Sequence, residues 1–116
     1  GTGKSTLAAF IVWHLVQQRP TGLHILLAAP SNTGADVLCA KLARLGLDDT
    51  RMLRLNALGR SFATVPEELR RYCHTTVGED GRPVFKTPSV PELRSFKVVV
   101  TTCICASHVA NALRRE

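Results

Sequence analysis

The opening of the chain, Gly1-Thr2-Gly3-Lys4-Ser5-Thr6, and the two segments after it constrain the fold more than any other feature. Apolar residues recur at three- and four-residue spacing over residues 4–18, which predicts an amphipathic helix. Residues 23–29 are almost all apolar, as expected of a strand that is covered on both faces in a parallel sheet. A loop of glycine, lysine and hydroxyl residues, followed by a helix and a buried strand, predicts a nucleotide phosphate site on an α/β fold.

The residue types of this opening match the end of a phosphate-binding loop, G-x-x-x-x-G-K-[ST]. Gly1 and Gly3 allow close approach of the backbone and positive φ, so that successive N–H groups face phosphate oxygens. Lys4 is expected to place an ammonium against the β- and γ-phosphates, and Ser5 to offer a hydroxyl to Mg²⁺. The following helix adds the positive end of its dipole. Six such residues also occur in plain turns, and the segments that follow favour the phosphate site.

Helices and strands continue to alternate along the chain. Strands are predicted at residues 51–55, where Met52 alternates with arginines, and at residues 96–102, and a last helix at residues 107–115. The stripe expected to be buried on the first helix consists of Leu7, Phe10, Ile11, His14 and Leu15. A second helix, ended by Gly46, is expected to bury Ala35, Leu38, Cys39, Leu42 and Leu45. This order predicts an α/β fold of the P-loop NTPase class, with a doubly wound parallel sheet.

Residues 56–95 are less regular than the rest and hold four of the six prolines. A short helix is predicted at 67–72, a turn at 78–81 and a short strand at 84–86. Because a forty-residue plain loop is improbable inside a compact domain, we interpret the stretch as a small inserted subdomain. The predicted division is therefore 1–55, the insert 56–95, and 96–116 as the continuation of the first part.

The charge of the chain favours a polyanionic partner. Fifteen Lys and Arg against nine Asp and Glu give a formal net charge of +6, and residues 51–116 hold eleven of the basic and six of the acidic residues. Cations of this kind release counterions from nucleic acid when they neutralise phosphates. A solvated basic surface on part of a larger protein is an equally open interpretation.

The four cysteines, Cys39, Cys73, Cys103 and Cys105, lack the C-x₂₋₄-C pairs of common zinc sites. Reduced, mostly buried thiols in a cytosolic protein are therefore preferred over a zinc site that includes His74. No apolar run approaches the length of a membrane span. Since the chain opens inside a motif, we expect it to be a piece of a longer protein.

The segment Ala28-Ala29-Pro30-Ser31-Asn32-Thr33-Gly34-Ala35-Asp36 follows the predicted strand at 23–29. Loops at the carboxyl ends of strands line the ligand cleft of a doubly wound sheet. Short hydroxyl and amide side chains there suit contacts with a sugar–phosphate backbone. Capping of the following helix explains the same residue types without a ligand, and for this segment alone it is the simpler interpretation.

Taken together, GTGKST, APSNTGAD and VVVTTCICAS resemble motifs I and Ia and the downstream strand motif of superfamily 1 helicases. Among these, the chain resembles the RNA helicases related to the nonsense-mediated-decay helicase, and within them the Moloney leukaemia virus resistance/Armitage group. The resemblance covers essentially the whole chain and implies a partial first RecA-like domain with an accessory insert. It implies that ATP and Mg²⁺ bind at Gly1, Thr2, Gly3, Lys4, Ser5 and Thr6, with Lys4 catalytic and Ser5 on the metal.

The resemblance also implies a path for single-stranded RNA. Its backbone would be contacted by Pro30, Ser31, Asn32, Thr101 and Thr102. For the insert cations, further phosphate contacts and a solvated face are equally open; these are Arg60, Arg70, Arg71, Arg82 and Lys86. By the same resemblance we expect silencing or mRNA-decay proteins as partners, no membrane, and a location in the cytoplasm, including ribonucleoprotein granules.

The leading functional prediction is an ATP-dependent RNA helicase or translocase. The Asp–Glu motif that holds Mg²⁺ in this group is not among these residues, because the acidic pairs at 67–68 and 79–80 lie in irregular sequence. The second RecA-like domain is expected elsewhere in the longer protein, so the fragment alone should hydrolyse ATP weakly or not at all. The alternatives are a phosphate-loop phosphotransferase and a non-catalytic RNA-binding scaffold.

Overall fold

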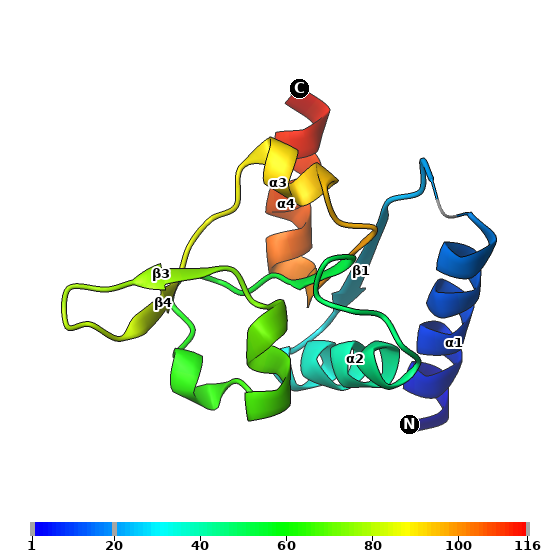
Figure 1. Ribbon diagram of the computed structural model, residues 1–116, viewed down its shortest axis with the longest axis horizontal. Coiled ribbons are helices and arrows are strands. Elements are labelled where there is room, and N and C mark those ends of the chain that lie inside the picture. Colours follow the sequence, from blue (N-terminus) through cyan, green and yellow to red (C-terminus); the bar gives the residue numbers. More distant parts are fainter. Residues whose placement is uncertain (1, 20, 116) are drawn as a thin grey trace.

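The computed structural model describes residues 2–19 and 21–115. Helices and strands follow each other in the predicted order, with a hairpin and one short helix added inside the insert (Figure 1). The elements are α1 (Thr2–Gln18), β1 (Ile25–Ala29), α2 (Asn32–Arg44), β2 (Met52–Arg54), the 3₁₀ turns η1 (Phe62–Thr64) and η2 (Glu67–Tyr72), β3 (Thr75–Val77), β4 (Pro83–Phe85), α3 (Val90–Arg94), β5 (Val98–Thr102) and α4 (Cys103–Arg115).

A three-stranded parallel sheet with the order β1-β5-β2 forms the centre of the molecule. Ile25 of β1 and Met52 of β2 both lie opposite Val98 of β5, and Ala29 lies opposite Thr102. The predicted α/β class with a parallel sheet is confirmed. Because β5 is the central strand, its run of valines is buried on both faces, as the apolar sequence predicts.

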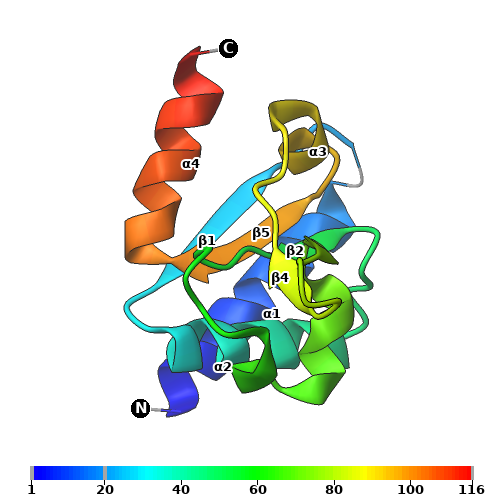
Figure 2. The same ribbon diagram turned by 90° about the vertical axis from the view of Figure 1, so that its left-hand side faces the viewer.

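Helices cover both faces of this sheet (Figure 2). On one face, α1 and α2 pack with the sheet in the larger apolar cluster. On the other face, α3 and α4 contribute Leu93 and Val109 to a smaller cluster with Leu53 and Val99 of the sheet. No helix in the described ranges is both long and apolar enough to cross a membrane.

The predicted buried stripe of α1 is wrong. Leu7 and Ile11 are 62% and 51% exposed, and the residues that α1 buries are Ala9, Val12 and Val16. Apolar residues surround most of this helix, so its sequence contains two apolar faces rather than one. The face with the smaller side chains lies against α2 and the sheet, because small residues let two backbones approach closely.

Two strand predictions also need correction. The predicted alternation of β2 is absent, because Met52, Leu53 and Arg54 are all buried. An arginine is buried in a strand only when its charge has a partner, and Arg54 has one in Asp36, 2.9 Å away. β1 is not covered on both faces: as an edge strand, it leaves Leu26 38% exposed.

Residues 56–95 pack onto the main core instead of building one of their own. Val65, Leu69 and Phe85 belong to the larger cluster, and the Tyr72 hydroxyl donates to the carbonyl oxygen of Leu47 at 3.0 Å. The turn predicted at 78–81 is confirmed: it joins β3 and β4, with Gly81 at φ 81°. The domain boundaries remain a prediction.

Candidate functional site

The first turn of α1 contains most of the predicted phosphate site. The helix begins at Thr2, so Gly3, Lys4 and Ser5 are helical. Gly3 does not adopt the positive φ that a glycine permits, since the positive-φ glycines of the described ranges lie elsewhere in the chain. The predicted role of Gly1 lies outside the described residues.

The groups at this helix end suit a polyphosphate. Lys4 is exposed and takes part in none of the ion pairs among residues 2–19 and 21–115, and Ser5 is half-buried. The first turn carries no acidic side chain, so the partial positive charge of the helix end is not cancelled. Thr6 accepts a hydrogen bond from Lys41 Nζ at 2.6 Å, which holds a second ammonium next to this turn. An ammonium, a hydroxyl and a helix N-terminus form a donor set that fits Mg²⁺-ATP.

The turn between β1 and α2 exposes Pro30, Ser31 and Asn32 directly after the strand. Ser31 is extended at φ −141° and ψ 163°, and its hydroxyl oxygen accepts a hydrogen bond from the Gly34 N–H at 3.1 Å. The capping interpretation is thus confirmed. The same hydroxyl keeps its proton for donation to another group, so capping and ligand contact do not compete.

The end of β5 separates the two threonines that were predicted to contact RNA. Thr101 is completely buried, and its hydroxyl donates to the Leu55 carbonyl oxygen at 3.0 Å. This burial argues against the predicted RNA contact of Thr101, and its cause is the position of β5 as the central strand, which is covered on both faces as far as Thr101. Thr102 is half-buried beside Ala29, where its hydroxyl oxygen accepts from the Cys105 N–H at 3.4 Å.

These three segments lie on one side of the molecule. Figure 2 shows the N-terminal end of α1, the turn between β1 and α2, and the start of α4 on the left-hand side of the view. This side is the carboxyl edge of the parallel strands, where ligands bind in open α/β sheets. The fold therefore brings the predicted phosphate residues and the predicted RNA residues to the same edge.

A buried ion cluster next to this edge was missed in the sequence. Asp36 of α2 accepts from Arg54 Nε at 2.9 Å and from Arg60 Nη2 at 2.8 Å. Arg54 also donates through Nη2 to the side-chain oxygen of Asn32 at 3.2 Å and through Nη1 to the Leu55 carbonyl oxygen at 2.6 Å. The available signal was an arginine in the middle of an apolar strand, which requires a buried anion nearby.

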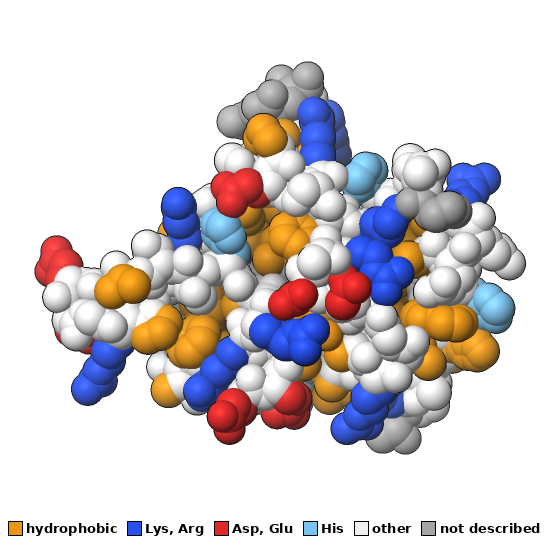
Figure 3. Space-filling model, viewed as in Figure 1, with side chains coloured by type: hydrophobic (Ala, Val, Ile, Leu, Met, Phe, Trp, Pro, Cys, Tyr) orange, Lys and Arg blue, Asp and Glu red, His pale blue; other side chains and the backbone are white. Residues whose placement is uncertain are grey.

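The Lys and Arg side chains of the insert differ in exposure and in the contacts they already make. Arg60 is bound to Asp36, and the Arg70 guanidinium lies 5.1 Å from the centre of the Phe62 ring. Arg71, Arg82 and Lys86 are exposed, and two of them form surface ion pairs: Arg71 with Asp49 at 3.5 Å and Arg82 with Asp80 at 4.0 Å. In Figure 3, Lys and Arg side chains are spread over the face in view, with acidic side chains between them, and do not form one basic patch. A phosphate contact through Arg60 would require breaking its buried pair.

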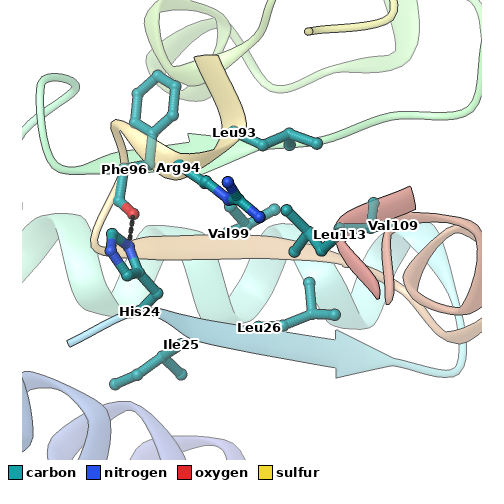
Figure 4. Close-up of a pocket in the computed structure, with 9 residues that line it drawn as sticks. All are labelled: His24, Ile25, Leu26, Leu93, Arg94, Phe96, Val99, Val109 and Leu113. Atoms are coloured by element: carbon teal, nitrogen blue, oxygen red, sulfur yellow. Dashed lines mark hydrogen bonds between the residues drawn. The ribbon is translucent and has the colours of Figure 1, made fainter. Parts of the chain in front are cut away.

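The pocket in Figure 4 lies among β1, β5, α3 and α4, away from the residues described above. His24 Nδ1 lies 2.9 Å from the Phe96 carbonyl oxygen at its rim, and most of the remaining lining is apolar. Its volume is about 90 Å³, well below the ~300–1,000 Å³ of typical ligand pockets. This pocket is too small for a nucleotide.

The cysteines of the described ranges are free thiols, and no three His, Cys, Asp or Glu residues there are placed to hold a metal ion.

Burial raises the pKa of the Cys39 thiol to about 12. We expect Cys39 to stay unmodified by iodoacetamide at pH 8, because the thiolate is the reactive form. Exposed Cys103 should be alkylated under the same conditions. Peptide mass spectrometry of the native intact protein measures both, and modification of Cys39 at the rate of Cys103 would contradict this burial.

Comparison with known proteins agrees with the motifs. The chain is 30% identical over 115 residues to MOV-10 of Gallus gallus, which covers 97% of this chain and 11% of that protein. It is 31% identical over 104 residues to the RNA helicase Mov10l1 of Homo sapiens, covering 89% of this chain and 8% of the relative. It is 36% identical over 83 residues to the ATP-dependent helicase upf1 of Schizosaccharomyces pombe, covering 62% and 9%.

The chain spans about a tenth of the length of the curated relatives it matches. No protein-family model matches it, and no solved structure is significantly similar. The sequence matches to MOV-10 of Gallus gallus and to Mov10l1 of Homo sapiens cover 97% and 89% of the chain. The chain is therefore homologous to one segment of the MOV-10, Mov10l1 and upf1 helicases, the group that its motifs resemble.

Proposed function

We propose that the intact protein is an ATP-dependent RNA helicase or translocase, and that this chain is part of its first RecA-like domain. The observation that carries the proposal is the convergence of the first turn of α1, the β1–α2 turn and the end of β5 at one edge of the parallel sheet. Of the relatives, Mov10l1 is named an RNA helicase and upf1 an ATP-dependent helicase, and these names support RNA and ATP as the two ligands.

Lys4 and Ser5 are the residues proposed to hold ATP and Mg²⁺. Bound Mg²⁺-ATP supplies the γ-phosphoryl group whose transfer to water drives the cycle. The Lys4 ammonium neutralises negative charge on the phosphates, the Ser5 hydroxyl oxygen is a ligand for the metal, and the N–H groups of the first turn bind phosphate oxygens. Within residues 2–19 and 21–115, the Lys4 ammonium has no ion-pair partner and the first turn of α1 has no carboxylate, which supports this assignment.

Ser31, Asn32 and Thr102 are the residues proposed to contact the RNA backbone. Their hydroxyl and amide groups donate to phosphate oxygens or to ribose hydroxyls. Phosphate and ribose are the same in every nucleotide, so these contacts do not distinguish one base from another. Binding is therefore expected to be largely independent of sequence. Closure of a second RecA-like domain over ATP would then move the protein along the RNA.

The proposal extends to the cellular setting. A helicase of this group would act in the cytoplasm and in ribonucleoprotein granules, together with silencing or mRNA-decay proteins. This setting follows from the resemblance of the GTGKST and APSNTGAD motifs to the nonsense-mediated-decay helicase group.

ATP hydrolysis by the full-length protein, with and without single-stranded RNA, tests the proposal. We expect RNA to raise the turnover rate about tenfold or more, which corresponds to ~1.4 kcal/mol of the barrier. Turnover that RNA leaves unchanged would contradict the helicase and favour a phosphotransferase. RNA binding without any turnover would instead favour a non-catalytic scaffold.

A further inference from the structure

The ion cluster of Asp36, Arg54 and Arg60 joins three parts of the chain next to the β1–α2 turn. The side chains of Arg54, Arg60 and Asp36 are 0%, 8% and 11% exposed. Asp36 belongs to α2, Arg54 to β2, and Arg60 to the insert. Asp36 Oδ1 accepts from Arg54 Nε at 2.9 Å and from Arg60 Nη1 at 3.2 Å, and Oδ2 accepts from Arg60 Nη2 at 2.8 Å. The cluster therefore fixes the position of α2 against β2 and the insert.

Arg54 extends the cluster to the exposed residue Asn32. Its Nη2 donates to the Asn32 side-chain oxygen at 3.2 Å and lies 3.4 Å from the Asn32 carbonyl oxygen. A guanidinium only donates hydrogen bonds, so it selects the orientation in which the amide oxygen of Asn32 faces Arg54. The amide nitrogen is then on the other branch of the side chain. Among the described residues, none accepts a hydrogen bond from it.

Stability alone is a weak explanation for such a cluster. Removing charged groups from water costs free energy, and well-packed apolar residues of similar size often stabilise a protein as well or better. The best-attested use of buried charges is to select one arrangement among several. Here the selected arrangement leaves the NH₂ group of the exposed residue Asn32 without an acceptor among the described residues, and phosphate oxygens accept from such donors.

We propose that Arg54 is a positioning residue for RNA binding: held by Asp36 and Arg60, it orients the Asn32 amide so that its NH₂ group donates to an RNA phosphate. The inference rests on the proposed function. Arg54 itself is buried and touches no RNA. Arg60 supports it indirectly, by binding Asp36, so that the insert contributes to the RNA site without a direct contact.

A double-mutant cycle on the full-length protein tests this positioning. The measured quantity is the Kd for a fluorescein-labelled oligouridine, for wild type, Asn32→Ala, Arg54→Lys and the double variant. We expect Asn32→Ala to weaken binding about tenfold, because a hydrogen bond to a charged phosphate is lost. Arg54→Lys keeps the charge but cannot span Asp36, Asn32 and the Leu55 carbonyl together, and should weaken binding about fivefold.

The two effects should not add, so that Arg54→Lys has no further effect when Asn32 is already alanine. The dependence of the Kd on salt should stay the same in Arg54→Lys, since no phosphate contact is lost there. Arg94→Lys, an exposed arginine of α3, is the matched control and should bind like wild type. Thermal melting shows whether each variant is folded, and Arg60→Lys replaces Arg54→Lys if the latter is unfolded.

The outcomes separate the inference from the proposed function. If Asn32→Ala binds RNA like wild type, both the RNA site and the positioning are wrong. If Asn32→Ala weakens binding while Arg54→Lys does not, or if the two effects add, the RNA site stands and the positioning is overturned. If Arg54→Lys weakens RNA binding when Asn32 is present but not when residue 32 is alanine, the proposal is supported.

Discussion

Replacing Lys4 by alanine in the full-length protein is expected to lower the rate of ATP hydrolysis by about 10²–10³-fold, the usual effect of removing one group that stabilises transition-state charge. Lys4 lies exposed in the first turn of α1, where the described ion pairs leave its ammonium unpaired. Truncation therefore removes the charge without breaking a contact that holds the fold. The measurement is steady-state turnover at saturating RNA, with ATP varied to separate kcat from KM.

Arg19→Ala is the matched control, because Arg19 is an exposed cation at the opposite end of the same helix. It should hydrolyse ATP at the wild-type rate. Hydrogen exchange of peptides from α1 and β5 should be the same in Lys4→Ala and wild type, which would show that the fold is retained. Turnover of Lys4→Ala within about threefold of wild type would exclude the proposed phosphate site. Such a change in rate corresponds to less than the ~1.4 kcal/mol of a tenfold change, too little for the loss of a charge that binds the phosphates.

The fold could be predicted where one physical requirement decided the pattern. The central strand β5 is buried on both faces and begins with three consecutive valines, so its position followed from hydropathy. Gly46 follows α2 with φ 108°, the conformation that its place after the helix predicts. The face of α1 could not be predicted, because two apolar faces compete and only the packing of Ala9 and Val12 on neighbouring elements selects one.

The site was predictable as a set of segments but not as a set of contacts. Motif spacing located Lys4, Ser31 and Asn32, and all three residues are exposed, as a ligand contact requires. Thr101 and Thr102 are equivalent in sequence, yet the first is buried within the central strand and the second, its last residue, is half-buried. The pairing of Asp36 with Arg54 depends on the register of β2 beside β5, which no local pattern encodes.

The substitution Asp36→Ala should have the largest effect on stability. It leaves Arg54 buried without its carboxylate and releases Arg60, whose two bonds to Asp36 are 3.2 and 2.8 Å long. Removing one partner of a buried pair typically costs about 3–5 kcal/mol, because a charge stays in the interior uncompensated. Hydrogen exchange of the intact protein, followed by mass spectrometry, measures this locally: peptides from α2 and from residues 56–64 should exchange about 10²–10³-fold faster.

Asp49→Ala gives the comparison that isolates burial as the cause. Asp49 pairs with Arg71 at 3.5 Å, but these side chains are 41% and 59% exposed. An exposed pair contributes ~0–1 kcal/mol, so the same peptides should exchange at nearly the wild-type rate. Both variants remove one carboxylate, and they differ mainly in the solvation of the arginine left behind. Equal exchange in the two variants would mean that water reaches Arg54 once Asp36 is gone, and the cluster would then contribute no more than a surface ion pair.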